Sequence, residues 1–113
     1  MRDGDGRAHI EGPLLLLDPD TAQAIAVTVH ELATNAAKYG ALSVSDGRVR
    51  VEWSQTPSGG VVLRWTETNG PAVKPPMQQG FGTRVIESMI GTHLKGQVRF
   101  VWSEQGLTCE IAW

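Results

Sequence analysis

The chain has 113 residues, a formal charge of −2 and a pI near 5.9. This length allows one domain with a single hydrophobic core, and the near-neutral charge argues against a surface for nucleic acid or anionic lipid. The leucine run at 14–17 is too short to span a membrane. One cysteine, Cys109, excludes an internal disulfide. These features favour a cytoplasmic protein whose partners are neither membranes nor nucleic acids.

The start of the chain predicts a linker followed by two short strands. Residues 1–7 are polar and rich in glycine, which is typical of a frayed lead-in, so we expect the domain to span residues 8–113. An edge strand is expected around residues 9–11. The leucines at 14–17 are apolar on both faces, as in a buried strand.

A long helix is predicted from about Pro19 to Tyr39. Asp18 offers an N-cap oxygen, proline is tolerated in a first helical turn, and Gly40 suits a left-handed stop. The helix carries an apolar stripe that should face the core. Its members are Ile25, Val29, Leu32, Ala36 and Tyr39.

A polar stripe, Glu31, Asn35 and Lys38, lies beside the apolar one and has two interpretations. An acid, an amide and an amine in one column can supply a base, a metal-binding oxygen and a phosphate contact. The same residues also fit an ordinary exposed face with an i,i+4 pair. A zinc site is not expected, because Thr34 stands where a metalloprotease helix has its second histidine. His30 is expected to be a packed or hydrogen-bonded histidine.

The middle of the chain predicts a hairpin that leads into a long loop. Alternating residues at 48–53 and 61–65 predict two strands. Glu67 continues the inward-facing positions of the second strand, where a glycine-rich loop over residues 68–82 begins. A buried carboxylate needs a partner, so Glu67 is a candidate ligand acceptor. The alternative is a surface acid that ends the strand.

A second helix is predicted to begin at Thr83, acting as its cap, and to end just before Gly96. The preceding residues 80–82 offer bare backbone amides to an anion such as phosphate. Arg84 is either a further phosphate contact or a solvated charge. Strands at 98–102 and 107–113 then close the chain.

Strands that two helices cover from one side predict an α/β two-layer sandwich, with helices on one face of a mixed, largely antiparallel sheet. All four tryptophans fall in or beside predicted strands, which places most of the aromatic core in the sheet.

Three motifs together resemble the ATP-binding catalytic domain of the HWE family of sensor histidine kinases, within the GHKL ATPases. They are HELATNAAKYGALS at 30–43, Trp65-Thr66-Glu67, and GFGTR at 80–84. The resemblance in order and spacing runs from about Gly12 to Trp113. The family's α/β sandwich, the Bergerat or GHKL fold, agrees with the architecture predicted above.

The resemblance implies roles for the polar stripe and for Glu67. Asn35 would hold the Mg²⁺ that bridges the phosphates of ATP, and Lys38 would reach a phosphate. Tyr39 would line the nucleotide pocket. Glu31 is implied as the catalytic acid, which orients a water in ATP-hydrolysing relatives and polarises the accepting histidine in a kinase. Glu67 would take the place of the usual aspartate and accept a hydrogen bond from the adenine amino group.

The resemblance also implies an ATP lid that runs from Gly70 to Gly80. The residues that it adds to the ATP site are Gly70, Gly80, Gly82, Thr83 and Arg84. Asn69 stands where the first glycine box is expected to have a glycine, and asparagine tolerates the left-handed conformation that such a turn needs.

These observations predict a catalytic domain that transfers the γ-phosphoryl group of ATP to a histidine on a separate helical domain, upstream of a response regulator. None of His9, His30 and His93 has the context of a phosphorylated histidine, so we expect a catalytic fragment that is monomeric and inactive alone. The alternative is a degenerate domain that docks a response regulator without catalysis. The motif Trp65-x-Glu67 argues against a serine kinase of the anti-sigma-factor type.

Overall fold

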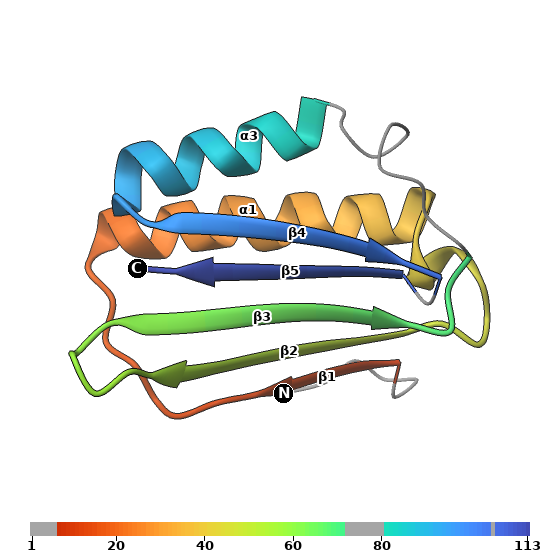
Figure 1. Cartoon of the computed structure of the whole chain (residues 1–113), viewed down its shortest axis with the longest axis horizontal. Helices are drawn as coiled ribbons and strands as arrows, with labels where there is room; N and C mark the ends of the chain where they lie inside the picture. Colours follow the sequence, from red (N-terminus) through yellow and green to blue (C-terminus); the bar gives the residue numbers. More distant parts are fainter. Residues whose placement is uncertain (1–6, 72–80, 105) are drawn as a thin grey trace.

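The computed structural model describes residues 7–71, 81–104 and 106–113 (Figure 1). Its elements are β1 (Ala8–Glu11), α1 (Pro19–Lys38), the 3-10 turn η1 (Ala41–Ser43), β2 (Arg48–Gln55), β3 (Val61–Thr68), α3 (Phe81–Met89), the π-helical turn η2 (Ile90–Leu94), β4 (Gln97–Ser103) and β5 (Gly106–Ala112).

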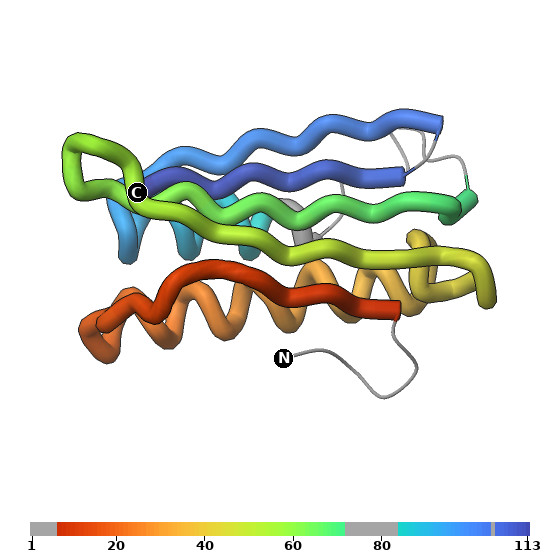
Figure 2. Tube along the Cα trace, turned by 90° about the horizontal axis from the view of Figure 1, so that it is seen from below, coloured from red at the N-terminus to blue at the C-terminus, as the bar shows by residue number. Residues whose placement is uncertain are grey.

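The strands form one sheet in the order β1-β2-β3-β5-β4. Only β1 pairs in parallel, with β2, and the other neighbours are antiparallel. Figure 2 shows α1 and α3 on the same side of this sheet. The predicted α/β two-layer sandwich, with helices on one face of a mixed, largely antiparallel sheet, is confirmed.

Helix α1 begins as predicted, because Asp18 accepts a hydrogen bond from the backbone N–H of Thr21 at 2.8 Å. Its fully buried positions are Ala24, Thr28, Leu32 and Ala36. The prediction that Tyr39 belongs to the core stripe is wrong, since Tyr39 is the C-cap and is 58% exposed. The stripe follows a strict spacing of four, and the helix ends before it reaches the tyrosine.

The end of α1 also differs from the prediction at Gly40. Its φ is −110°, so it is not a left-handed stop. The backbone N–H groups of Tyr39 and Gly40 instead donate to the carbonyl of Asn35, at 2.8 and 3.2 Å. Gly40 instead lets the backbone lie close to the side chain of Glu67.

The predicted buried strand at 14–17 is wrong. This segment connects β1 to α1, and Leu14 and Leu16 are 94% and 96% exposed. β1 lies at the edge of the sheet and pairs with β2, so the described residues offer no further strand to pair with the leucines. The chain leaves the sheet beside Trp53, whose indole N–H donates to the carbonyl of Pro13 at 2.7 Å.

The second helix begins at Phe81, so the prediction that Thr83 caps it is wrong: Thr83 lies within the first turn. Phe81 and Gly82 are both able to adopt helical dihedrals, and neither marks a boundary in the sequence. The helix continues through η2 and ends at Lys95, which is left-handed with φ 53°. Gly96 lies just past this end, as predicted.

The core lies between the helices and the inner face of the sheet. It includes Leu32 of α1, Ile86 and Ile90 of the second helix, and Trp65 and Ile111 of the strands. The other three tryptophans pack against this cluster from the strands or beside them, which confirms the predicted aromatic core.

Arg7, which the sequence assigned to the lead-in, contacts the folded part of the chain. Its side chain donates to the carbonyls of Val44 and Gly47.

Among the described residues no helix is both long enough and apolar enough to cross a membrane.

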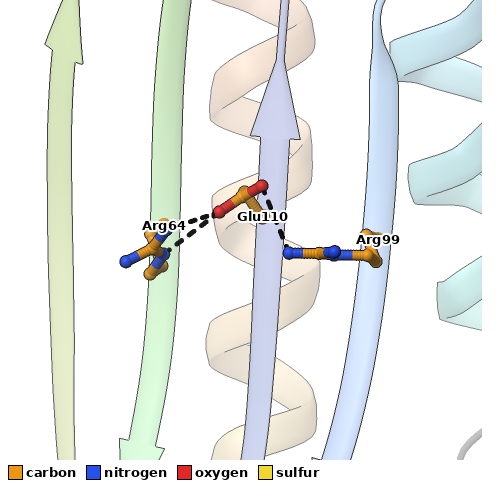
Figure 3. Close-up of polar contacts among 3 residues, drawn as sticks. All are labelled: Arg64, Arg99 and Glu110. Atoms are coloured by element: carbon orange, nitrogen blue, oxygen red, sulfur yellow. Dashed lines mark hydrogen bonds and ion pairs between the residues drawn. The ribbon is translucent and has the colours of Figure 1, made fainter.

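The face of the sheet without helices carries ion pairs. Glu110 of β5 lies between Arg64 of β3 and Arg99 of β4 (Figure 3), with nitrogen–oxygen distances of 2.6 and 3.5 Å. The hydrogen bond from Arg64, together with the charges of both arginines, lowers the pKa of Glu110.

Candidate nucleotide site

Several predicted site residues meet at one end of the molecule. β3 ends at the same end as α1, and β5 begins there (Figure 1). Glu67 is the penultimate residue of β3, and Gly106 is the first residue of β5. This end therefore brings Glu67 next to the residues that follow α1.

Glu67 is buried and hydrogen-bonded on both of its carboxylate oxygens. It is 4% exposed. Its Oε2 accepts from the indole Nε1–H of Trp65 at 2.9 Å, and its Oε1 accepts from the backbone N–H of Ala41 at 2.9 Å. Burial raises the pKa of Glu67, while the two hydrogen bonds oppose that rise. The inward-facing prediction is confirmed, and the alternative of a surface acid is wrong.

Three glycines let the backbone come close to this carboxylate. A Cβ on Gly40 would collide with Oε1 of Glu67, and a Cβ on Gly70 would lie 2.7 Å from the Cα of Ala41. Gly106 has φ +135°, and a Cβ there would lie 3.0 Å from the Cβ of Glu67. The end of α1, the end of β3 and the start of β5 therefore pack with almost no side chains between them.

The residue after β3 adopts the conformation expected of the glycine that it replaces. Asn69 has φ 59°, in the left-handed region. The turn that leads into the predicted lid is thus formed with asparagine. Gly70 lies against Ala41, whereas residues 72–80 of the predicted lid, including Gly80, lie outside the described residues.

The polar stripe of α1 lies on one flank of the buried stripe. Glu31 and Asn35 are half-buried, and Lys38 is exposed. At 100° per residue, this flank is opposite to the one formed by Ile25 and Val29. The interpretation as an ordinary exposed face therefore fits Lys38 better than it fits Glu31 or Asn35.

The remaining predicted contacts are only partly described. Gly82 and Thr83 lie in the first turn of α3, and Arg84 follows them with an exposed side chain. His30 is exposed on α1, which contradicts the first of the two alternatives for it, a packed histidine, and leaves the hydrogen-bonded one. The structure brings Glu67 and Gly70 together with the end of α1, and it leaves the phosphate-binding role of 80–84 as a prediction.

Among the described residues, the arrangement suits a Mg²⁺ ion that arrives with a nucleotide and does not form a metal site by itself. These residues contain no group of three or more His, Cys, Asp or Glu side chains that could hold a metal ion. Mg²⁺ commonly keeps its waters and binds through one or two protein oxygens and substrate phosphates. A half-buried amide such as that of Asn35 fits an ion that arrives with a nucleotide, rather than a preformed protein site.

Sequence reasoning missed the two donors of Glu67. Trp65 and Glu67 are two residues apart on a strand, a spacing that places both side chains on the same face, so this pair was open to prediction. Ala41 was not, because its N–H meets Glu67 across 26 residues of chain.

An apolar groove lies elsewhere in the molecule. It has a volume of about 690 Å³ and is lined by β1, the connection that follows it, Ile25 and Val29 of α1, and Trp113. None of the described candidate site residues lines it. The groove therefore gives no support to the candidate site around Glu67.

The chain is similar to curated histidine kinases over most of its length. It is 39% identical over 106 residues to a blue-light-activated histidine kinase of Rhizobium johnstonii and 35% identical over 108 residues to one of Brucella ovis. Each alignment covers 93% of this chain but only 31% and 22% of the relatives, so the chain spans less than a third of their length. No family model matches it.

Solved histidine kinases share the fold. The histidine kinase domain of the Erythrobacter litoralis EL346 blue-light activated kinase has a TM-score of 0.81 at 17% identity, covering 97% of this chain and 52% of that one. The catalytic domain of the kinase ThkA has a TM-score of 0.69 at 13% identity, covering 93% and 76%. ThkA in complex with the response regulator TrrA scores 0.67 at 15% identity, covering 93% and 33%. The resemblance to a histidine kinase catalytic domain is confirmed.

Proposed function

We propose that this chain, which has the sequence and fold of a histidine kinase catalytic domain, binds Mg²⁺-ATP and transfers the γ-phosphoryl group to a histidine on a separate domain. The motif Trp65-x-Glu67 favours the HWE group among these kinases. The observation that carries the proposal is Glu67, a buried carboxylate with no cationic partner among the described residues, beside the end of α1.

Glu67 has the chemistry to distinguish adenine from guanine. Each carboxylate oxygen has two lone pairs and uses one of them for Trp65 or Ala41, which leaves acceptor capacity for an N–H donor. The exocyclic amino group of adenine is such a donor. Guanine has a carbonyl oxygen at the equivalent position, and opposing two acceptors costs about 1–3 kcal/mol, or more for a charge. ATP is therefore the expected nucleotide.

The phosphate end of the nucleotide is assigned to α1 and to the start of α3. Asn35 would hold Mg²⁺ through its amide oxygen, and Lys38 would neutralise a phosphate. Gly80, Gly82 and Thr83 would donate to phosphate oxygens, with Arg84 as a further cation. Bound Mg²⁺ neutralises charge on the phosphates during transfer.

The metal assignment is tested by the change Asn35→Ala. Losing the amide oxygen should remove the magnesium-dependent part of ATP binding and leave the magnesium-independent part. The measurement is calorimetric titration with ATP, with and without Mg²⁺. Gln23→Ala, at an exposed position in the first half of α1, is the control. Unchanged magnesium dependence in Asn35→Ala would contradict the assignment.

The acceptor histidine is assigned to another domain because none of the three histidines is placed to receive phosphate. Phosphoryl transfer needs the acceptor nearly in line with the γ-phosphate. His9 lies on the edge strand β1 and contacts Glu11. His30 is exposed on α1, and His93 lies in η2 at the far end of the second helix from Phe81. Glu31, half-buried on α1, is assigned to polarise the incoming histidine.

The phosphotransfer proposal is tested with γ-labelled ATP. The purified chain alone should incorporate no label, and adding a histidine-bearing helical domain should give label that is labile in acid and stable in base. Stoichiometric labelling of the chain alone would contradict it. Failure to bind any nucleotide would instead favour a docking module without catalysis.

The proposal extends to partners and location. The solved complex of ThkA with TrrA supports a response regulator as the downstream partner. We place the domain in the cytoplasm, because its single cysteine is free, as is usual for proteins of a reducing compartment.

A further inference from the structure

Trp65 makes a polar contact that its place in the core does not require. It is 3% exposed and packs within the hydrophobic core. Its indole N–H nevertheless reaches Oε2 of Glu67. Burial alone does not supply an indole with a partner, since the buried Nε1 of Trp102 has no hydrogen-bond partner in the part of the chain that the structure describes.

The two donors to Glu67 come from different parts of the fold. Trp65 precedes Glu67 by two residues on β3 and binds Oε2, while Ala41 begins η1 after α1 and binds Oε1. Oε1 also fills the space beside Gly40 that a side chain would take. Each carboxylate oxygen thus accepts a hydrogen bond from a separate element, and the two hydrogen bonds together fix the plane of the carboxylate.

We propose that Trp65 is the positioning residue for base recognition: its indole N–H holds Glu67 so that the free lone pairs of the carboxylate face the amino group of adenine. This inference rests on the proposed function. Glutamate has more rotatable bonds than aspartate and loses more conformational freedom when it is ordered. A donor that orders Glu67 before the nucleotide arrives reduces that loss on binding.

The hydrogen bond also affects the charge of Glu67. An N–H donor favours the ionised carboxylate, and the contact with Trp65 lowers the pKa of Glu67 against the rise that burial causes. Cys109 of β5 is the titratable neighbour that interacts with Glu67, and its thiol stays neutral because its pKa is about 12. Losing the indole donor should therefore shift the pH at which ATP binding is lost to a higher value.

The test compares Trp65→Phe with Trp53→Phe. Both changes replace an indole on the central hairpin by a smaller ring and remove one hydrogen bond, but Trp53 donates to Pro13 and lies away from Glu67. A hydrogen bond to a charged group is worth enough to give about a tenfold effect. Trp65→Phe should weaken ATP binding by about that factor, reduce the preference for ATP over GTP, and raise the midpoint of the pH profile. Trp53→Phe should change none of the three.

A double-mutant cycle separates positioning from general packing. If Trp65 acts through Glu67, Trp65→Phe should have little further effect on ATP affinity once Glu67 is replaced by Ala. The same fold-loss in both backgrounds, or an unshifted pH profile in Trp65→Phe, would overturn the inference. Absence of ATP binding by the unmodified chain would instead overturn the proposed function, so the two failures are distinguishable.

Discussion

Glu67 and Glu110 lie on neighbouring strands of one sheet, on opposite faces and in opposite surroundings. Glu110 is on the open face between two arginines, which lower its pKa (Figure 3). Glu67 is under the helices with two neutral N–H donors, and burial raises its pKa. One carboxylate is thus paired with arginines on an exposed face, and the other is buried with no cationic partner among the described residues.

The difference distinguishes a carboxylate on the exposed surface of the sheet from one that the proposed function assigns to nucleotide binding. Ion pairs on an exposed face contribute little to stability, and they keep an open sheet surface polar. Burying a carboxylate beside no cation costs free energy of folding, and an apolar residue at the same position would avoid that cost. The presence of Glu67 at the end of β3, beside three closely packed glycines, is therefore better explained by binding than by folding.

The largest expected effect comes from Gly40→Ala. The new Cβ would occupy the position of Oε1 of Glu67, so the carboxylate must move from its donors. We expect ATP affinity to fall by more than about tenfold and unfolding free energy to fall by about 1–3 kcal/mol. Calorimetry and urea unfolding measure the two changes.

Two further variants test whether the effect of Gly40→Ala is specific to its contact with Glu67. Gly91 has open space around the position of a Cβ, so Gly91→Ala should leave both quantities unchanged or raise stability slightly. Adding Glu67→Asp to Gly40→Ala shortens the acid and should restore part of the stability. Full ATP affinity in Gly40→Ala would mean that the position of Oε1 is unimportant for binding.

The pH dependence of stability should have opposite signs for the two glutamates. Glu67 has a raised pKa in the folded state, so the folded state binds more protons and stability falls as pH rises from 4.5, its ordinary value, through the folded value. Glu110 has a lowered pKa, so its contribution is present above 4.5 and is lost as pH falls through the folded value.

Urea unfolding across this pH range measures both contributions. Glu67→Gln should remove the decline on the alkaline side, and Glu110→Gln should remove the loss on the acid side. If both variants change the same side of the profile, the contrast between the two carboxylates is wrong.

The smallest effect is expected from Glu110→Ala. Its ion pairs are partly exposed, so unfolding free energy should fall by less than about 1 kcal/mol. High salt should reduce the difference further, because exposed charges are screened. Urea unfolding at low and high salt is the measurement, and a loss of several kcal/mol would show that the open face is more than a polar surface.

The parts of the fold that the sequence predicted depend on local signals. The capping contact of Asp18 and the regular spacing of buried residues defined α1, and alternation defined the strands on each side of Glu67. The buried strand predicted at 14–17 is absent because the apolar character of the leucines does not indicate whether a neighbouring strand is available for pairing. Tyr39 was misread because the end of the helix, set by backbone contacts, precedes the last position of the stripe.

The candidate site was predictable to the same degree. The alternation of the strand predicted that Glu67 faces inward, and the i,i+2 spacing places Trp65 on the same face of the strand. The contact with Ala41 and the close approach of Gly40 depend on how α1 and β3 meet in space. No local pattern encodes that meeting, which explains why the inward-facing position of Glu67 was predicted from the sequence and its contact with the N–H of Ala41 was not.

Calorimetric titration of the chain with Mg²⁺-ATP and Mg²⁺-GTP tests the assignment of Glu67 most directly. The unmodified chain should bind ATP and clearly prefer it to GTP. Glu67→Ala should weaken ATP binding and shrink that preference, whereas Glu110→Ala, which removes the other carboxylate, should change neither. Equal affinity for the two nucleotides in the unmodified chain, or an unchanged ratio in Glu67→Ala, would contradict the assignment of Glu67 to adenine.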